Sequence, residues 1–218
     1  MLASSSQSAK LVELFLSEGK KQKFTKNEYI IRSGESPSGI FYIHRGIVKA
    51  YDLTKYQEEN LLIIRKSTEI FPLIWALTGQ ERSVIYQSLS NTVTYKISRD
   101  SFLDYLNKNP KALAPILDMT VEMYRLHSER ILNLEYRTVR ERLVSFMLTT
   151  AERFSVDETP NSKKLEVSLR HQDIASSINA TRETISRELS NLEKKGLIIK
   201  NGPYFILKDI ATLKKIIQ

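Results

Sequence analysis

Residues 181–190, TRETISRELS, place several side chains that could bind another molecule within ten positions. Successive residues of an α-helix lie about 100° apart around its axis. A helix here would present one polar and one apolar face: Arg182, Glu183, Ser186 and Arg187 on the first, and Ile185, Leu189 and Leu192 on the second. Arginine can donate to guanine O6 and N7, glutamate can accept from the cytosine amino group, and serine suits several base edges. The polar face could therefore read DNA, and a solvated surface helix with ordinary charge pairs is the alternative.

The preceding residues predict how such a helix would be positioned. The stretch RHQDIASSI (170–178) favours a first helix that buries Ile174 and Ile178 and leaves Ala175 where another helix can approach closely. Asn179 follows at the break, and asparagine tolerates the left-handed backbone that a tight turn requires. Thr181 suits the N-cap of the next helix. Together these features predict a helix-turn-helix, whose second helix enters the major groove of DNA.

Polar groups near the helix ends are suited to contacts with the DNA backbone. Such contacts fix the register of a protein on the duplex without reading its sequence. The candidates are Gln172, Thr181 and Thr184. We add His171 as a neighbour of a phosphate, with plain solvent exposure as the alternative.

The elements around this motif are those of a small winged domain. We expect a helix over 137–154, a polar loop over 155–164, a short strand over 165–169 and two helices within 170–194. Residues 196–209 predict a hairpin that turns at Asn201-Gly202, because Asn-Gly is a strong signal for a tight hairpin turn. The order of helix, turn, helix and hairpin is that of a winged helix.

The first half of the chain has the pattern of a β-rich domain. After a short helix near 9–16, runs rich in Ile, Val, Tyr and Phe alternate with turn residues. They predict strands within 29–35, 39–53, 60–66, 84–90 and 92–98, with glycines at 34, 39 and 46 in tight turns. Antiparallel strands at this spacing predict a sandwich or a jelly-roll barrel.

Helical periodicity returns over 101–106 and again over 111–134. The longer helix has two stripes, so we expect one to pack on its own domain and the other on a second copy of the chain. We assign the dimer contact to the stripe of Ile116, Thr120, Met123 and His127; the other stripe contains Leu117, Val121, Tyr124, Ser128 and Ile131. A hinge is expected at 133–136.

Bulk composition narrows the functional classes. The chain has 218 residues, enough for two domains, and a formal charge of +8 that favours a polyanionic partner. It has no cysteine, which excludes disulfides, thiolate zinc sites and cysteine-bound iron–sulfur clusters. We find neither a signal peptide nor an apolar run of the length of a membrane span, so we expect a cytoplasmic protein with no membrane partner.

At HQDIASSINATRETISRELSNLEKKGLI (171–198) and RERLVSFMLTTAERF (140–154), the chain resembles the Crp/Fnr family of bacterial transcription regulators. The resemblance implies an α+β fold with three parts. These are a β-roll sensor-like (jelly-roll, cyclic-nucleotide-binding-like) domain over 1–108, a dimerisation helix and hinge over 109–136, and a winged helix-turn-helix domain over 137–218. It also implies a homodimer that binds double-stranded DNA and contacts RNA polymerase.

The resemblance assigns roles within the second helix. Glu183 and Arg187 would be the principal base readers, while Arg182 and Ser186 would tune the half-site. It implies a palindrome with half-sites near TGTGA or TTGAT. The chain departs from the family pattern at Asn179, where a glycine is usual, and at Glu188, where an apolar residue is common.

The expected effector site also departs from the family pattern. Members that bind cyclic nucleotides hold the ribose with a Gly-Glu pair and the phosphate with an Arg-Ser pair. Arg82 and Ser83 stand at the second pair, but Phe71-Pro72 replaces the first, and Trp75 adds to an apolar neighbourhood. This disfavours binding of cAMP. We name Arg82, Ser83, Phe71 and Trp75 as a candidate effector pocket without assigning an effector, with a turn-anchoring ion pair as the alternative for Arg82.

Two other classes of function remain as alternatives. An enzyme with a β-barrel active site would need clustered catalytic groups, and the sequence shows no nucleophile motif, no metal-ligand spacing and no phosphate-cradling glycine loop. We therefore predict no catalytic residues, no metal site and no cofactor. A signalling module that binds a nucleotide or another small molecule without a DNA function is the second alternative.

Overall fold

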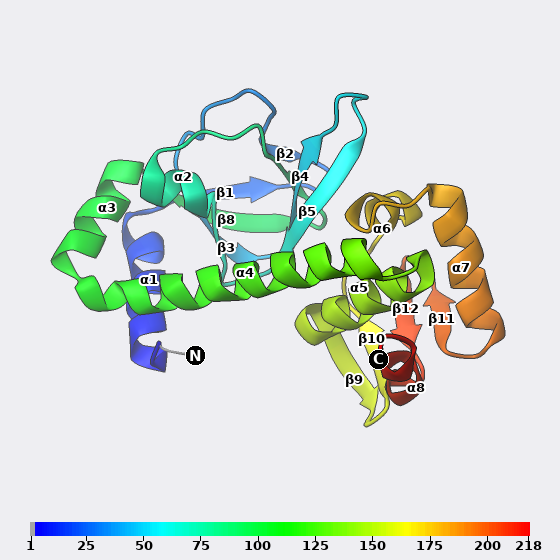
Figure 1. Cartoon of the computed structure of the whole chain (residues 1–218). Helices are drawn as coiled ribbons and strands as arrows, with labels where there is room; N and C mark the ends of the chain where they lie inside the picture. The colour runs from blue at the N-terminus through cyan, green and yellow to red at the C-terminus, as the bar shows by residue number, and fades with distance from the viewer. Residues whose placement is uncertain (1–2) are drawn as a thin grey trace. The chain divides into compact units, whose positions relative to one another are not determined.

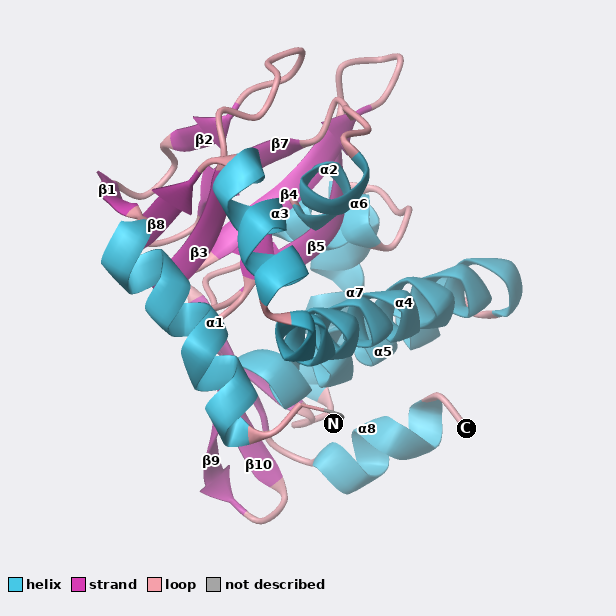
Figure 2. Ribbon diagram, turned by 90° about the vertical axis from the view of Figure 1, so that its left-hand side faces the viewer, coloured by secondary structure: helices cyan, strands magenta, loops and turns pink. Residues whose placement is uncertain are grey.

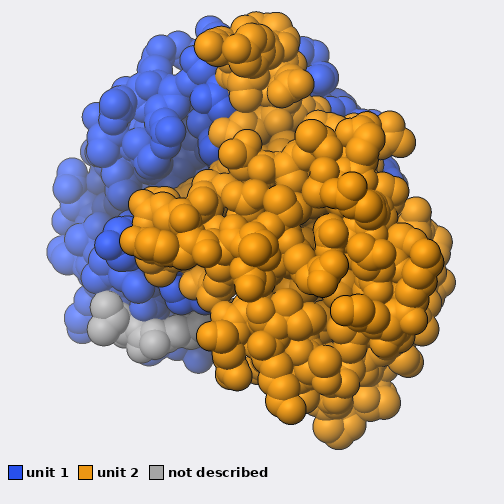
Figure 3. Space-filling view, turned by 45° about the vertical axis from the view of Figure 1, so that its right-hand side comes forward, with its two compact units in different colours: residues 1–52, 62–126 blue, residues 53–61, 127–218 orange. Residues whose placement is uncertain are grey.

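The structure is a computed structural model that describes residues 3–218. Its contacts divide the chain into two compact units, coloured separately in Figure 3. Unit 1 comprises residues 1–52 and 62–126, and unit 2 comprises residues 53–61 and 127–218. Domain boundaries at 108 and 136 stay a prediction.

Most of the strands in the first half of the chain form two four-stranded sheets. In spatial order, the first sheet contains β1 (Lys20–Phe24), β8 (Thr92–Ile97), β3 (Ile40–Arg45) and β6 (Ile70–Phe71), and the second contains β2 (Tyr29–Ile31), β7 (Ile85–Ser88), β4 (Val48–Leu53) and β5 (Glu59–Arg65). β8 pairs antiparallel with β1 and β3, and β7 pairs antiparallel with β2 and β4. The sandwich or jelly-roll expectation is therefore confirmed.

Strand β3 separates two hydrophobic cores because its side chains alternate between the faces of the sheet. Phe41 and Ile43 belong to a core formed with residues of β2, β4, β6 and β7. Ile40 and Tyr42 point to the other core, which is closed by helices α1 (Ser5–Glu18), α2 (Leu73–Thr78), α3 (Arg99–Lys108) and the start of α4 (Leu113–Tyr136). Figure 2 shows α1 (cyan) alongside β1 and β8 (magenta).

The sequence pattern does not predict strand β1, because its residues, KKQKF, are mostly polar. Its pairing with β8 makes it a strand, and that tertiary contact has no signature in the five residues themselves. The predicted turn at Gly46 is confirmed by its φ of 106°. A side chain there would also collide with Thr92, since a Cβ would lie 2.5 Å from the Thr92 hydroxyl oxygen.

A single helix, α4 (Leu113–Tyr136), follows a short 3-10 turn (Pro110–Ala112) and confirms the prediction of a long helix over 111–134 (Figure 1). The hinge expected at 133–136 is wrong, because the helix continues through Tyr136. The amide of Asn133 donates to the Ser145 hydroxyl at 3.0 Å and so fastens this end of α4 to the next helix. The break lies at Arg137 and Thr138 instead. Despite the length of α4, none of the helices in the described residues has both the length and the apolar character of a membrane span.

The two stripes of α4 have different environments in the single chain. Ile116 is 3% exposed and lies in the helix-covered core of unit 1, with Met123 packed against the same core. Thr120 is exposed and His127 is half-buried. The large exposed apolar side chains of α4 belong mainly to the other stripe: Leu117, Val121, Tyr124 and Ile131. The structure thus gives Ile116 and Met123, two of the residues we assigned to a dimer contact, a role inside their own domain.

Unit 2 combines the end of α4 with four further helices and one small sheet. The helices are α5 (Val139–Phe154), α6 (His171–Ser177), α7 (Arg182–Lys194) and α8 (Ile210–Ile216). The sheet has the order β11 (Ile198–Asn201), β12 (Tyr204–Leu207), β10 (Ser162–Leu165), β9 (Ser155–Thr159). The predicted hairpin turn is confirmed, with Gly202 at a φ of 60°. Asp209 caps α8, and its hydrogen bonds with Thr212 and then Asn161 lower its pKa to about 2.

Two expectations in this unit are wrong. The segment 155–164 is a hairpin of β9 and β10 rather than a loop, because β10 pairs with β12 as well as with β9. The strand expected over 165–169 is not formed: β10 ends at Leu165, the first residue of that range. Val167 and Leu169 are buried without belonging to a strand. Alternating apolar residues indicated burial correctly, but burial does not require a strand.

Candidate nucleic-acid interface

The turn between α6 and α7 has the predicted left-handed residue. Asn179 has a φ of 52°, and the amide of Ala180 donates to the carbonyl of Ala175 at 3.0 Å. Arg142, on α5, also donates to the Asn179 carbonyl at 3.4 Å. The turn is thus tied to α6 and to α5, and the order of α6, turn and α7 confirms the helix-turn-helix prediction.

The start of α7 is capped as the sequence predicts. The Thr181 hydroxyl accepts a hydrogen bond from the Thr184 amide at 3.1 Å, and Glu183 lies in the first turn, where a negative charge favours the helix dipole. The Thr181 and Thr184 hydroxyls also bond to each other at 3.0 Å. Both candidate backbone-contact hydroxyls therefore gather at one point at the start of α7.

The apolar face of α7 is fixed in the core of unit 2. Ile185, Leu189 and Leu192 are all buried. On α6, Ile174 and Ala175 are fully buried, so the small alanine lies at the close approach that the sequence predicts. Because this face is held against the core, the rotation of α7 about its axis is fixed and its polar face points outward.

The four proposed base-reading residues lie together on that outward face. Arg182, Glu183, Ser186 and Arg187 are exposed, and they line one open groove with His171 and Ser190. We call these four residues the recognition face. A protruding helix of α-helical diameter, about 10–12 Å, fits the major groove of B-DNA, which is about 12 Å wide.

The corner of this groove at His171 is electropositive. Burial lowers the pKa of His171, and the nearby positive charges of Lys200 and then Arg182 lower it further, against an opposing effect of Glu193. The buried Nε2 atom of His171 has no hydrogen-bond partner among the described residues. Sequence reasoning missed Lys200, whose strand brings it close to α6, while Gln172 is exposed beside His171 as expected.

The start of α6 is held by an arginine and a buried carboxylate. Arg170 precedes the helix and donates to the Asp173 carboxylate from Nε at 3.0 Å and from Nη2 at 2.8 Å. Asp173 also accepts from the Arg170 amide at 2.9 Å. These hydrogen bonds raise the pKa of Arg170 and fix the end of α6 that presents His171.

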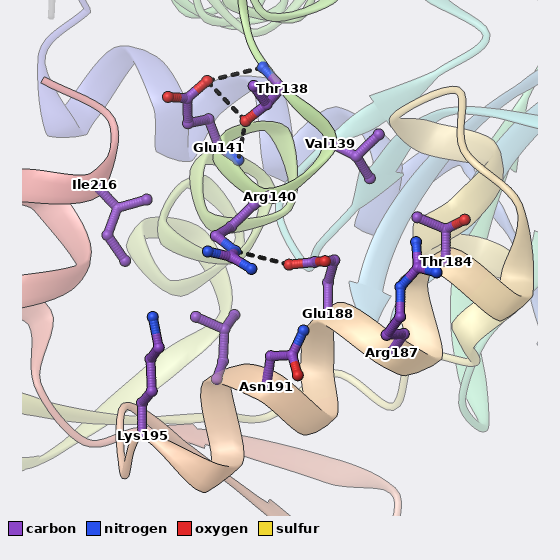
Figure 4. A pocket seen from close by; sticks show the side chains of 11 residues that line it. Thr138, Val139, Arg140, Glu141, Thr184, Arg187, Glu188, Asn191, Lys195 and Ile216 are labelled. Carbon is purple, nitrogen blue, oxygen red and sulfur yellow. Dashed lines mark hydrogen bonds and ion pairs between the residues drawn. The ribbon is translucent and has the colours of Figure 1, made fainter.

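A second groove runs along the other side of α7, between α7 and the start of α5 (Figure 4). We call it the flank groove; its lining includes Thr138, Arg140, Glu141, Arg187, Glu188 and Lys195. Arg140 extends from α5 and donates from Nε to Glu188 on α7 at 2.7 Å. Sequence reasoning missed this pair because its members are 48 residues apart.

The four residues named as a candidate effector pocket lie in different environments. Phe71 is fully buried in the core between the two sheets, whereas Trp75 packs against the helix-covered core. Arg82 and Ser83 are exposed.

The position of Phe71 shows what occupies this part of the β-rich domain. Its ring stacks on Phe41, with centroids 5.2 Å apart, and on Tyr86, with centroids 4.7 Å apart. Burial raises the pKa of Tyr86. Three stacked aromatic rings therefore fill the core around Phe71.

Two families of known domains match separate parts of the chain. Residues 21–109 match the cyclic nucleotide-binding domain, and residues 141–216 match the Crp-like helix-turn-helix domain. The chain is 25% identical over 194 residues to an anaerobic regulatory protein of Haemophilus influenzae, an alignment that covers 89% of this chain and 75% of that protein. It is 24% identical over 208 residues to the cAMP-activated global transcriptional regulator CRP of Salmonella typhimurium, covering 95% and 98% of the two chains.

Solved structures share the fold at low sequence identity. FixK2 from Bradyrhizobium japonicum superposes with a TM-score of 0.79 at 20% identity, covering 91% of this chain and 96% of that one. A CooA mutant from Carboxydothermus hydrogenoformans gives a TM-score of 0.78 at 22% identity, covering 93% and 89%. With both domains matched in order and the helix-turn-helix intact, the chain belongs to the Crp/Fnr family of DNA-binding transcription regulators.

Proposed function

We propose that the protein acts as a homodimer on a palindromic operator whose half-sites are read by the recognition face. The observation that carries this proposal is the joint exposure of Arg182, Glu183, Ser186 and Arg187 on a helix whose opposite face is buried. Glu183 and Arg187 act as the principal base readers. His171, Gln172, Thr181 and Thr184 contact the DNA backbone beside them.

The exposed stripe of α4 forms the contact between two copies of the chain. Leu117, Val121, Tyr124 and Ile131 recur at spacings of four, three and seven residues, which fits the seven-residue repeat of helices that pack in pairs. Val121 is 56% exposed and Tyr124 is 74% exposed, and exposed apolar patches of this kind mark interaction surfaces. This replaces the seam that includes Ile116 and Met123, which pack within unit 1. A symmetric dimer places two copies of α7 on half-sites one turn of DNA apart.

The DNA-bound form does not depend on cAMP. A cyclic nucleotide would need an acceptor for its ribose hydroxyl near position 72, where this chain has proline, and Phe71 is 0% exposed in its aromatic stack. The relative from Salmonella typhimurium is described as cAMP-activated. We expect no such response here, because Phe71-Pro72 stands where the family resemblance places the ribose-binding pair. Contact with RNA polymerase is part of the same proposal.

Selection of operators from randomised duplexes tests the proposed function. With ligand-free protein at fixed physiological salt, we expect a two-fold symmetric sequence, and added cAMP should change neither that sequence nor the affinity. Arg187→Ala should weaken binding to the selected operator by about 10- to 100-fold, because one good base contact contributes about 1–3 kcal/mol. Arg32→Ala, which removes an exposed arginine from unit 1, is the matched control and should bind normally. Recovery of no common sequence would contradict the proposal and favour a signalling module without a DNA function.

A charge placed in the exposed stripe of α4 should dissociate the dimer. Val121→Glu would bring two carboxylates into an apolar contact, where burial of unpaired charge is costly. We expect light scattering coupled to gel filtration to give the dimer mass for the unmodified chain and the monomer mass for this variant. Leu16→Glu introduces the same charge at an exposed leucine of α1, outside this stripe, and should remain dimeric. A dimer that survives Val121→Glu would show that the contact lies elsewhere.

Protonation of His171 should couple to DNA binding. Its pKa is lowered in the free protein, and a phosphate beside it would raise that pKa, so binding takes up a proton. Operator affinity should therefore increase as the pH falls from about 7.5 through the raised pKa, and level off below the pKa of the free protein. Titrations at constant salt should show this increase for the unmodified chain and for His44→Gln, whose histidine lies on β3. They should show a smaller one for His171→Gln, and an equal dependence in all three proteins would remove His171 from the interface.

A further inference from the structure

The flank groove contains a positively charged side chain, Arg140, that is paired with an acid in the DNA-free protein. Arg140 and Glu188 meet at 2.7 Å, with side chains 43% and 13% exposed. Arg140 lies in the first turn of α5, where a positive charge is disfavoured by the helix dipole, so its position does not serve the stability of that helix. Its ordered partner is the carboxylate on α7.

The other carboxylate at this end of the groove is engaged elsewhere. Glu141 accepts hydrogen bonds from the amide and hydroxyl of Thr138 at 2.8 and 2.9 Å and completes the capping box of α5. These hydrogen bonds hold the pKa of Glu141 below its ordinary value. Glu188 is therefore the acid that compensates Arg140, as the dashed contacts in Figure 4 show.

The flank groove would face a strand of the DNA backbone. Arg187 lines both this groove and the groove of the recognition face, so the two are neighbouring sides of one helix. When a helix fills the major groove, the phosphates of the two strands lie along its sides. A basic side chain in the flank groove is thus positioned for a phosphate contact, which adds affinity without reading sequence.

We infer that Glu188 withholds Arg140 from the DNA backbone and so limits the sequence-independent affinity of the protein. This rests on the proposed function. While the pair is closed, the two charges cancel and Arg140 releases no counterion from DNA. Glu188 is thus a tuning residue that contacts no base: it sets how strongly the protein binds any duplex, while the recognition face sets which duplex it prefers.

The salt dependence of binding to a duplex of arbitrary sequence tests this inference. Neutralising one phosphate changes the slope of log affinity against log salt by about 0.9. Glu188→Gln should free Arg140 and steepen the slope by about that amount for each bound protomer. The double variant Arg140→Gln/Glu188→Gln should return to the slope of the unmodified chain, because no cation is left to free. Asp157→Asn makes an equal charge change and frees Lys163 from an ion pair at 2.6 Å between β9 and β10; it is the matched control and should leave the slope unchanged.

Two results would overturn the inference while leaving the proposed function intact. One is a Glu188→Gln variant that selects the same operator as the unmodified chain and shows the same dependence of log affinity on log salt. The other is a shallower slope in Arg140→Gln alone, which would show that Arg140 already contacts a phosphate in the presence of Glu188. If the unmodified chain bound neither its operator nor the arbitrary duplex, the proposed function and this inference would both be wrong.

Discussion

The burial of one face of α7 is the constraint on which the proposed DNA interface depends. Ile185 and Leu189 of α7 pack near Ile174 and Ala175 of α6. All four side chains are within a few per cent of full burial. Burial of an aliphatic side chain of this size contributes about 1.5–3 kcal/mol, so rotating α7 to bury its charged face would cost several such contributions. The polar residues at 182, 183, 186 and 187 are therefore held outward by packing rather than by contacts of their own. Asn179 and Thr181 then set where the helix starts.

Burial of side chains also defines the interior of the sensor-like domain. Its strands form two sheets, but the interior at Phe71 is filled by side chains of the protein. The rings of Phe41, Phe71 and Tyr86 stack there, and aromatic pairs in such arrangements contribute about 0.5–1.5 kcal/mol beyond their burial. In this domain, the protein's own aromatic rings pack the core around Phe71. This packing supports the proposal that DNA binding does not require a cyclic nucleotide.

The features predicted correctly from the sequence are those encoded by neighbouring residues. The left-handed turn depends on Asn179, the cap of α7 on Thr181, and the wing on Asn201-Gly202, each of which acts within a few positions of itself. The features that were missed depend on partners far along the chain. Strand β1 exists because it pairs with β8, the β9–β10 hairpin because it joins β12, and the contact between Arg140 and Glu188 because two helices meet. The periodicity of α4 predicted two apolar stripes, but only the packing of Ile116 showed which one faces its own domain.

The most direct test of the central claim, that the recognition face reads bases, is a cycle between one side chain and one base atom. Each guanine of the selected half-site is replaced in turn by 7-deazaguanine, which lacks the N7 acceptor, and operator affinity is measured for the unmodified chain and for Arg187→Ala. The account predicts one position per half-site at which the base change weakens the unmodified chain by about tenfold and leaves the variant unaffected, because the contact is already absent there. Equal losses in both proteins at every guanine would contradict it.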